Sequence, residues 1–286
     1  MKKMKTMKKS NKLLKKIILT TIAIFIAALI IFPVFWVLLA AFKGRQELFA
    51  LPNTFFPKKF VFDNFTKVFE VDVNDSTFLK SMVSTFVVAV LATFTSLMVN
   101  MFAGYALARI EFRGKKLLWL FVLFPMFIPG ITIMLTSIRV VNILNMVDTI
   151  FVLFVPGMAN SYQIFFFRQF YYGIPSNIEE AAVIDGATRF KTFFKIFLPM
   201  STTPMVIIGV GTFMGAWNNF IWPTLTVTNN ADLVQVMQII RTLNTAYSGQ
   251  YGVVIAATLM SLIVPIAVFG IFQKKIVEGI ALTGTK

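Results

Sequence analysis

The chain has 286 residues, of which 57% are hydrophobic and 14% are charged, whereas about 25% of residues are charged in an ordinary soluble domain. It contains no Cys and no His, which excludes disulfides, thiol nucleophiles, zinc sites built on these residues and histidine acid–base relays. The net charge of +15 would suit a nucleic-acid-binding protein, but the hydrophobic residues lie in long uncharged runs that are typical of bilayer-crossing helices. We therefore expect a membrane protein that binds lipid and no nucleic acid.

The first of these runs follows a basic tail at residues 1–16, which carries eight Lys, and covers residues 17–42. The apolar part of a signal peptide usually has about 7–15 residues, so this run is too long, and no small-residue cleavage site ends it. We predict a retained first transmembrane helix. Residues 43–80 are predicted to be an extracytoplasmic loop with a short helix near residues 63–70.

The rest of the chain, residues 81–273, is predicted to be a core with five further transmembrane helices. These are expected at residues 81–108, 117–138, 149–167, about 200–225, and from about 251 to 273. A spanning segment must satisfy its own backbone hydrogen bonds, so the predicted fold is all-α and polytopic with six transmembrane helices. None of the six runs contains Asp, Glu, Lys or Arg. Ion-coupled carriers place such residues in the membrane, so their absence favours energy supplied from outside the bilayer.

The positions of the basic residues predict the orientation of the chain. Nineteen of the 27 Lys and Arg residues fall on one side of the predicted membrane, in residues 1–16, 109–116, 168–195 and 274–286. By the positive-inside rule this side is cytoplasmic, so both termini, including the C-terminal tail at 274–286, are expected inside and close to anionic lipid.

The most informative segment is the cytoplasmic loop predicted at residues 168–199. Ser176 and Glu179 stand three residues apart after a proline and predict a capping box at the start of a helix. Asp185 and Gly186 are expected to end this helix, because Gly reverses the chain at low cost. Thr188 is expected to cap a second helix. The apolar stripe of that helix has the spacing i, i+3, i+4, i+7, at Phe190, Phe193, Phe194 and Phe197.

The same loop carries a second, more specific pattern of residues. It consists of Glu180, Ala181 and Ala182, then Gly186 after three residues, and then Ile196, Leu198 and Pro199. The loop resembles the E-A-A loop of bacterial ABC importer permeases of the carbohydrate class, the class of the smaller maltose-transporter permease. Segments 104–109, 217–223 and 272–280 resemble that family as well.

The resemblance implies a coupling helix around residues 178–184 that docks on a separate, dimeric ABC ATPase. The residues it assigns to this role are Glu179, Glu180, Ala181, Ala182, Asp185 and Gly186. Glu180 would pair with a basic residue of the ATPase, and Ala181 and Ala182 would pack in its groove. The chain lacks a phosphate-binding G-x4-G-K-[ST] loop, so ATP hydrolysis is expected on the partner.

The resemblance also implies the other components of the transporter. We expect a heterodimer with a second permease subunit, an extracytoplasmic solute-binding protein and a location in the bacterial cytoplasmic membrane. The chain itself is expected to hold no cofactor or metal and to be no enzyme.

The transported molecule is expected to be a sugar or oligosaccharide, since amides and aromatic rings suit hydroxyl-rich ligands. The candidates for the substrate path are Trp217, Asn218, Asn219, Asn160 and Gln163. Each of them is also compatible with helix–helix packing. Two other functions stay open: an autonomous secondary carrier or channel for a small polar solute, and a membrane-embedded enzyme.

Overall fold

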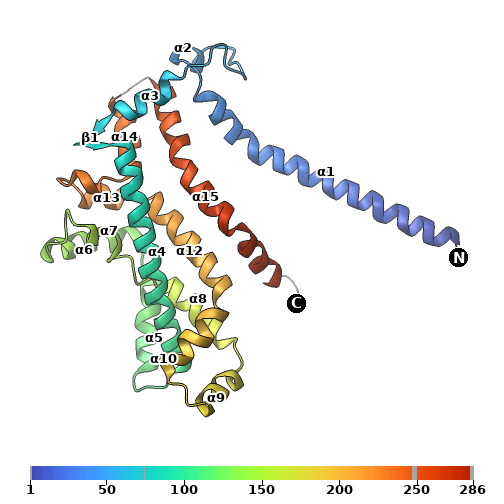
Figure 1. Cartoon of the computed structure of the whole chain (residues 1–286), viewed down its shortest axis with the longest axis vertical. Coiled ribbons are helices and arrows are strands. Elements are labelled where there is room, and N and C mark those ends of the chain that lie inside the picture. Colours follow the sequence, from blue (N-terminus) through green and yellow to red (C-terminus); the bar gives the residue numbers. More distant parts are fainter. Residues whose placement is uncertain (1, 74, 247–249, 284–286) are drawn as a thin grey trace. The chain divides into compact units, whose positions relative to one another are not determined.

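The computed structural model describes residues 2–73, 75–246 and 250–283, and most of them are helical (Figure 1). The chain divides into two compact units. The first comprises Met1–Val68 and Leu243–Met260, and the second comprises Phe69–Thr242 and Ser261–Lys286. Helices α3 (Asp63–Glu70), α14 (Val236–Ala246) and α15 (Tyr251–Thr283) each contribute residues to both units. Of the predicted tail, residues 284–286 lie outside the described residues, as does residue 1 of the N-terminal tail.

The first unit contains α1 (Lys2–Ala40), which covers the first predicted run without a break at Pro33, and α2 (Arg45–Leu48). Its 28 residues from Leu13 to Ala40 are apolar and long enough to cross a membrane. The short helix predicted near 63–70 is confirmed as α3. Its buried Asn64 donates from Nδ2 to the carbonyl oxygens of Ala41 (2.7 Å) and Lys43 (3.0 Å), which ties α3 to the turn after α1.

The second unit begins with a two-stranded antiparallel hairpin, β1 (Asp72–Val73) and β2 (Ser76–Thr77), and continues with helices. The helices before the loop are α4 (Phe78–Arg109), α5 (Lys115–Leu123), η1 (Phe124–Phe127), α6 (Gly130–Ile143), α7 (Ile150–Phe154) and α8 (Ser161–Tyr172). The remaining elements are α9 (Ser176–Ile184), α10 (Arg189–Thr192), η2 (Phe193–Phe197), α11 (Leu198–Met200), α12 (Thr202–Trp217), α13 (Ile221–Thr226) and η3 (Ala231–Leu233). Helix α4 packs against both α8 and α12.

The third predicted transmembrane helix, at residues 117–138, is not continuous. Helix α5 passes into the 3₁₀ turn η1 and ends before Pro129, and α6 leaves at an angle of 108°. Pro125 lies inside η1 and Pro129 precedes α6. Proline removes a backbone donor and disfavours helical geometry in the residue before it, which explains the break.

The fourth and fifth predicted helices are also interrupted. Residues 149–167 contain the whole of the short α7, a loop with Pro156 and Gly157, and the start of α8, which Asn160 caps. Helix α12 ends at Trp217, α13 is separate, and the segment Arg189–Met200 meets α12 at 77°. Each of these runs is free of charged residues, but whether a run forms one continuous helix depends on the proline, glycine and capping residues inside it.

Three helices in the described part of the chain are long and apolar enough to cross a membrane, or up to five if each bent pair counts as one crossing. The continuous ones are Leu13–Ala40, Phe78–Arg109 and Tyr251–Gly279. The last begins at Tyr251 as predicted, but α15 continues beyond residue 273 to Thr283.

Gly104 allows the closest approach between α4 and α8. A Cβ atom added there would lie 2.8 Å from the Phe167 Cβ and 3.0 Å from the Arg168 backbone nitrogen, so the two helices would have to separate. We expect Gly104→Ala to destabilise the purified protein by about 1–3 kcal/mol, the usual cost of overpacking. Thermal unfolding in detergent measures this loss.

The matched control is Gly211→Ala in α12, where an added Cβ meets nothing within 4 Å. This variant is expected to unfold at or slightly above the wild-type temperature, because Ala favours a helix by about 1 kcal/mol over Gly. Equal melting temperatures for the two variants would contradict the close packing of α4 and α8.

Candidate functional site

Helix α9 and the turn that follows it form the loop that the sequence singled out. The turn has the hydrogen bonds of a Schellman motif: Ala187 N–H donates to Ala182 O (2.9 Å) and Gly186 N–H to Val183 O (3.0 Å). Gly186 has φ = +71°, a left-handed conformation that strains any residue with a Cβ. Asp185 is the last residue before this turn. The predicted helix end at Asp185 and Gly186 is confirmed.

Helix α9 starts where the sequence predicted, but without the predicted cap. The helix begins at Ser176, but Pro175 precedes it and no side chain caps it, so the capping box expected from Ser176 and Glu179 is wrong. Glu179 instead turns toward Arg109 at the end of α4, with 3.8 Å between Nη1 and Oε2. The carboxylate that would have completed the capping box therefore pairs with a cation from another helix.

The outer face of α9 is exposed and mixed in character. Glu180, Ala181 and the turn residues Asp185 and Gly186 are exposed, as are two large apolar residues, Val183 (61%) and Ile184 (85%). Ala182 is 7% exposed, so it packs inside this chain. Of the two alanines that the resemblance assigns to a partner's groove, Ala181 is the exposed one, and the assignment stays a prediction.

Arg109 joins the end of α4 to the base of this loop. Its side chain is 11% exposed, and its Nη2 donates to the carbonyl oxygens of Tyr171 and Ile174 at the end of α8. Its guanidinium also lies over the ring of Phe197, 5.3 Å from the centroid. Together with Glu179, these contacts connect α4, α8, α9 and η2 through one buried cation.

The second half of the loop starts as predicted. The Thr188 hydroxyl accepts a hydrogen bond from Lys191 N–H and caps α10. The expected apolar stripe is divided, however: Phe193 and Phe197 are buried, whereas Phe190 (67%) and Phe194 (41%) are exposed. Residues 193–197 form a π-helical turn, which adds a residue to the turn and places Phe193 and Phe197 against Tyr105.

Two of the substrate-path candidates lie in a polar cluster between α4, α8 and α12. Asn100 Oδ1 accepts from Asn160 N–H (2.8 Å), and Asn100 Nδ2 donates to Gln163 Oε1 (3.0 Å). Gln163 Nε2 donates to Thr212 Oγ1 (3.0 Å). The side-chain amide of Gln163 is thus satisfied inside the protein and fits the alternative of helix–helix packing. Asn160 is exposed, joins the cluster through its backbone N–H, and caps α8 with its Oδ1.

The other three candidates cluster at the end of α12. Trp217 is 1% exposed and stacks on Phe213, with ring centroids 6.0 Å apart. Asn218 is exposed, and its Nδ2 donates to Met214 O of its own helix (2.9 Å). Asn219 is half-buried. Of the five candidates, Asn160 and Asn218 are the two exposed ones and so the two that are accessible to a solute.

Comparison with known proteins decides between the possible functions of this loop. Residues 100–280 match the family described as "Binding-protein-dependent transport system inner membrane component". The chain belongs to this family. The matched residues include the Arg109 cluster, α9 and the Gly186 turn, so these are parts of a permease component.

Curated relatives match this chain over nearly its whole length. The arabinooligosaccharides transport system permease protein AraQ of Halalkalibacterium halodurans is 31% identical, over 92% of this chain and 93% of the relative. The sn-glycerol-3-phosphate transport system permease protein UgpE of Yersinia enterocolitica is 30% identical, over 88% and 91%. The chain is thus a permease subunit rather than an enzyme, which confirms the ABC-importer resemblance seen in the sequence.

The fold agrees with a solved transporter. A chain of a bacterial ABC transporter involved in the import of the acidic polysaccharide alginate superimposes with a TM-score of 0.76 at 21% identity. The match covers 93% of this chain and 97% of that one. At this level of identity the likeness establishes the permease fold.

No individual role was predicted for three residues that stand out in the structure: Arg109, Val183 and Ile184. Arg109 was noted as a basic residue at the end of a membrane run and as the last residue of the segment 104–109 that resembles the family. An available signal was that it follows the small-residue segment 104–108, where helices can approach closely enough to share one side chain. Val183 and Ile184 fall within the coupling helix predicted around residues 178–184 but were given no role of their own, although two large apolar residues in a charged loop are typical of a docking surface.

Proposed function

We propose that this permease subunit imports a sugar or oligosaccharide, driven by a separate ABC ATPase that docks on α9. The observation that carries the proposal is the outer face of α9. Glu180 has no ion pair or hydrogen bond within the described part of the chain, and Val183 and Ile184 beside it are exposed. An acid flanked by apolar residues on a short, rigidly ended helix suits a basic, apolar groove on a partner.

The coupling would work because α9 is tied to the membrane helices. Arg109 links it to α4 and α8, and the π turn links the loop to α12. A movement of the ATPase against α9 would then shift packed helices rather than a loose loop. This is a two-state element biased by a ligand on a partner subunit.

The proposed topology has six crossings with both termini in the cytoplasm. Three are the continuous helices, two are the bent pairs, and the sixth is α7 with α8. In this arrangement α9 lies on the cytoplasmic side, where the distribution of Lys and Arg places it. Broken helices are tolerated at membrane depth where neighbouring protein satisfies the backbone.

The remaining partners follow from the family. They are a second permease subunit that completes the pathway, and an extracytoplasmic solute-binding protein that delivers the sugar. A sugar is the proposed substrate class because the relatives include an arabinooligosaccharide permease, and because the predicted runs contain no charged residue. An autonomous carrier or channel would need no ATPase.

Co-purification followed by reconstitution tests the proposal. The tagged chain is expected to bring down an ATPase and a second permease from mild detergent, identified by mass spectrometry. In liposomes with the binding protein, the complex should take up a sugar from a panel of oligosaccharides only when ATP is inside. A chain that purifies alone and transports without ATP would overturn the coupling mechanism and favour the carrier.

Asn218→Leu tests the substrate path. The side chain is exposed at the end of α12 and its hydrogen bond is local, so the change should leave stability and ATPase assembly unchanged. Loss of one solute hydrogen bond is expected to reduce the apparent affinity for the sugar by about fivefold to tenfold, or about 1–1.5 kcal/mol. Uptake at varied sugar concentration measures this, with Thr224→Val on exposed α13 as control. Wild-type affinity for all sugars tested would remove Asn218 from the path.

A further inference from the structure

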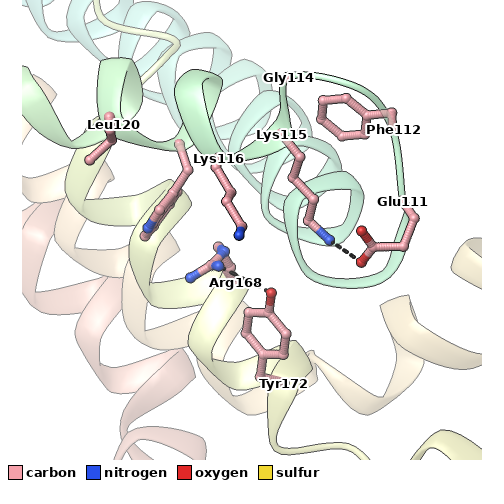
Figure 2. Close-up of a pocket in the computed structure, with 9 residues that line it drawn as sticks. Glu111, Phe112, Gly114, Lys115, Lys116, Leu120, Arg168 and Tyr172 are labelled. Carbon is pink, nitrogen blue, oxygen red and sulfur yellow. Dashed lines mark hydrogen bonds and ion pairs between the residues drawn. The ribbon is translucent and has the colours of Figure 1, made fainter.

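A pocket of about 640 Å³ lies where α5 and the turn before it meet α8, and the proposed transport mechanism does not use it (Figure 2). Its walls come from Arg168 and Tyr172 of α8 and, before and within α5, from Glu111, Phe112, Gly114, Lys115, Lys116, Trp119 and Leu120. The volume is within the range of about 300–1,000 Å³ found for small-molecule sites. Its lining is cationic and aromatic.

The acidic residue that lines the pocket, Glu111, already has a cationic partner. The Glu111 Oε1 lies 2.8 Å from the Lys115 Nζ, one helical turn away (Figure 2). The hydrogen bond and the charge of Lys115 hold the pKa of Glu111 below its usual value. Glu111 is 87% exposed while Lys115 is only 13% exposed, and both side chains line the pocket.

Two cations that line the pocket, Lys116 and Arg168, have no anionic partner in the part of the chain that the structure describes. Lys116 points into the pocket on the same side as the Arg168 guanidinium (Figure 2), and it has no ion pair among the residues described. Two like charges that face one space repel each other, and an anion between them removes that repulsion.

Arg168 is held rigidly in place. Its guanidinium lies 3.9 Å from the centroid of the Trp119 ring and 4.6 Å from that of Tyr172. Its Nε donates to Leu107 O (3.3 Å) and its Nη2 to the Tyr172 hydroxyl (3.0 Å). The other terminal nitrogen, Nη1, has no acceptor in the described ranges. A cation fixed by stacking with one free donor is pre-organised for an anionic oxygen.

We propose that this pocket binds the phosphate of an anionic phospholipid headgroup. The apolar side chains of Leu117, Leu120 and Phe121, each at least 60% exposed on the same helix, offer the acyl chains a surface next to the cations. Basic pockets between membrane helices on the cytoplasmic side suit anionic headgroups, and Trp and Tyr are enriched at that depth. The inference rests on the orientation given in the proposed function.

The test is lipid binding by the purified complex in mild detergent, with fluorescent phosphatidylglycerol and phosphatidylcholine as probes. Lys116→Gln is the informative variant, because Lys116 holds no other part of the fold, whereas Arg168 supports Leu107 O. Arg113→Gln is the matched control: it removes the same charge three residues away, in the turn before α5, but Arg113 does not line the pocket. Lys116→Arg preserves the charge.

Phosphatidylglycerol is expected to bind the wild-type complex more tightly than phosphatidylcholine. Lys116→Gln should weaken its binding by about fivefold, as expected for one cation at an anionic headgroup, while Arg113→Gln should change it less than about twofold. Lys116→Arg should bind as wild type. Inorganic phosphate at millimolar concentration should not displace the lipid, because it lacks the acyl chains.

If Lys116→Gln and Arg113→Gln weaken phosphatidylglycerol binding equally, the lipid responds to diffuse charge, and the proposed site is overturned. Equal binding of the two lipids would overturn it as well, and displacement by inorganic phosphate would show that the ligand is a soluble phosphate rather than a lipid. The assay needs neither ATP nor sugar, so a negative result leaves the importer function standing. Conversely, failure of ATP-dependent uptake leaves the lipid measurement valid.

Discussion

Glu180→Lys is expected to abolish ATP-dependent uptake while leaving the permease inserted and folded. The side chain is exposed on α9 and has no partner within the described part of this chain, so its reversal costs the isolated fold little. In the proposed complex it faces a basic groove, where a like charge costs about 2–5 kcal/mol, or more than about thirtyfold in affinity for the ATPase. Membrane immunoblots, co-purification of the ATPase and sugar uptake measure the three effects separately.

Glu278→Lys is the matched control, because Glu278 is another exposed acid on the predicted cytoplasmic side, in α15 and outside the loop. It should retain most uptake. Uptake by Glu180→Gln should lie between that of wild type and that of Glu180→Lys, since this change removes the attraction to the basic groove without adding repulsion. Wild-type uptake in Glu180→Lys would rule out α9 as the docking helix.

Arg109→Gln is expected to uncouple ATP hydrolysis from uptake and to destabilise the protein. Arg109 is nearly buried, and its removal leaves the carbonyl groups of Tyr171 and Ile174 and the ring of Phe197 without their cation. Breaking a buried charged cluster by removing one member costs about 3–5 kcal/mol. Thermal unfolding in detergent gives the stability change, and the ratio of sugar transported to ATP hydrolysed gives the coupling.

Two further variants separate the contacts of Arg109. Glu179→Gln should reduce stability by about 1 kcal/mol or less, because the ion pair is long at 3.8 Å and Glu179 is 20% exposed. Arg109→Lys keeps the charge but cannot reach two carbonyl oxygens and stack on a ring at once, so it should behave nearly as Arg109→Gln. Full activity of Arg109→Lys would show that charge alone suffices and would refute the proposed linkage through the carbonyl groups.

Features that depend on a few neighbouring residues were predictable from the sequence. Gly186 ends α9 because a left-handed turn favours Gly, and Thr188 caps α10 through a hydroxyl three residues away from its donor. The short helix α3 and the start of α15 at Tyr251 were likewise found where the local pattern placed them. The pattern Glu180, Ala181, Ala182 and Gly186 identified the family.

Features that depend on residues far apart in the chain were not predictable. Asp148 illustrates this: its carboxylate accepts hydrogen bonds from the backbone and side chains of Thr228 and Asn229, some eighty residues away. Burial raises the pKa of Asp148, but these four hydrogen bonds outweigh it and leave the pKa lowered. A single sequence contains no signal for such a pairing.

By itself, the sequence determined that this protein is a helical membrane permease, and it predicted a short helix in the loop that the proposal assigns to an ATPase. Hydrophobic runs, basic flanks and the loop pattern are local properties, and each follows from the chemistry of adjacent residues. Only the tertiary structure decided that Glu179 pairs with Arg109 instead of completing a cap, and that Ala182 is buried. In both cases a contact between distant segments outweighed what the local sequence favoured.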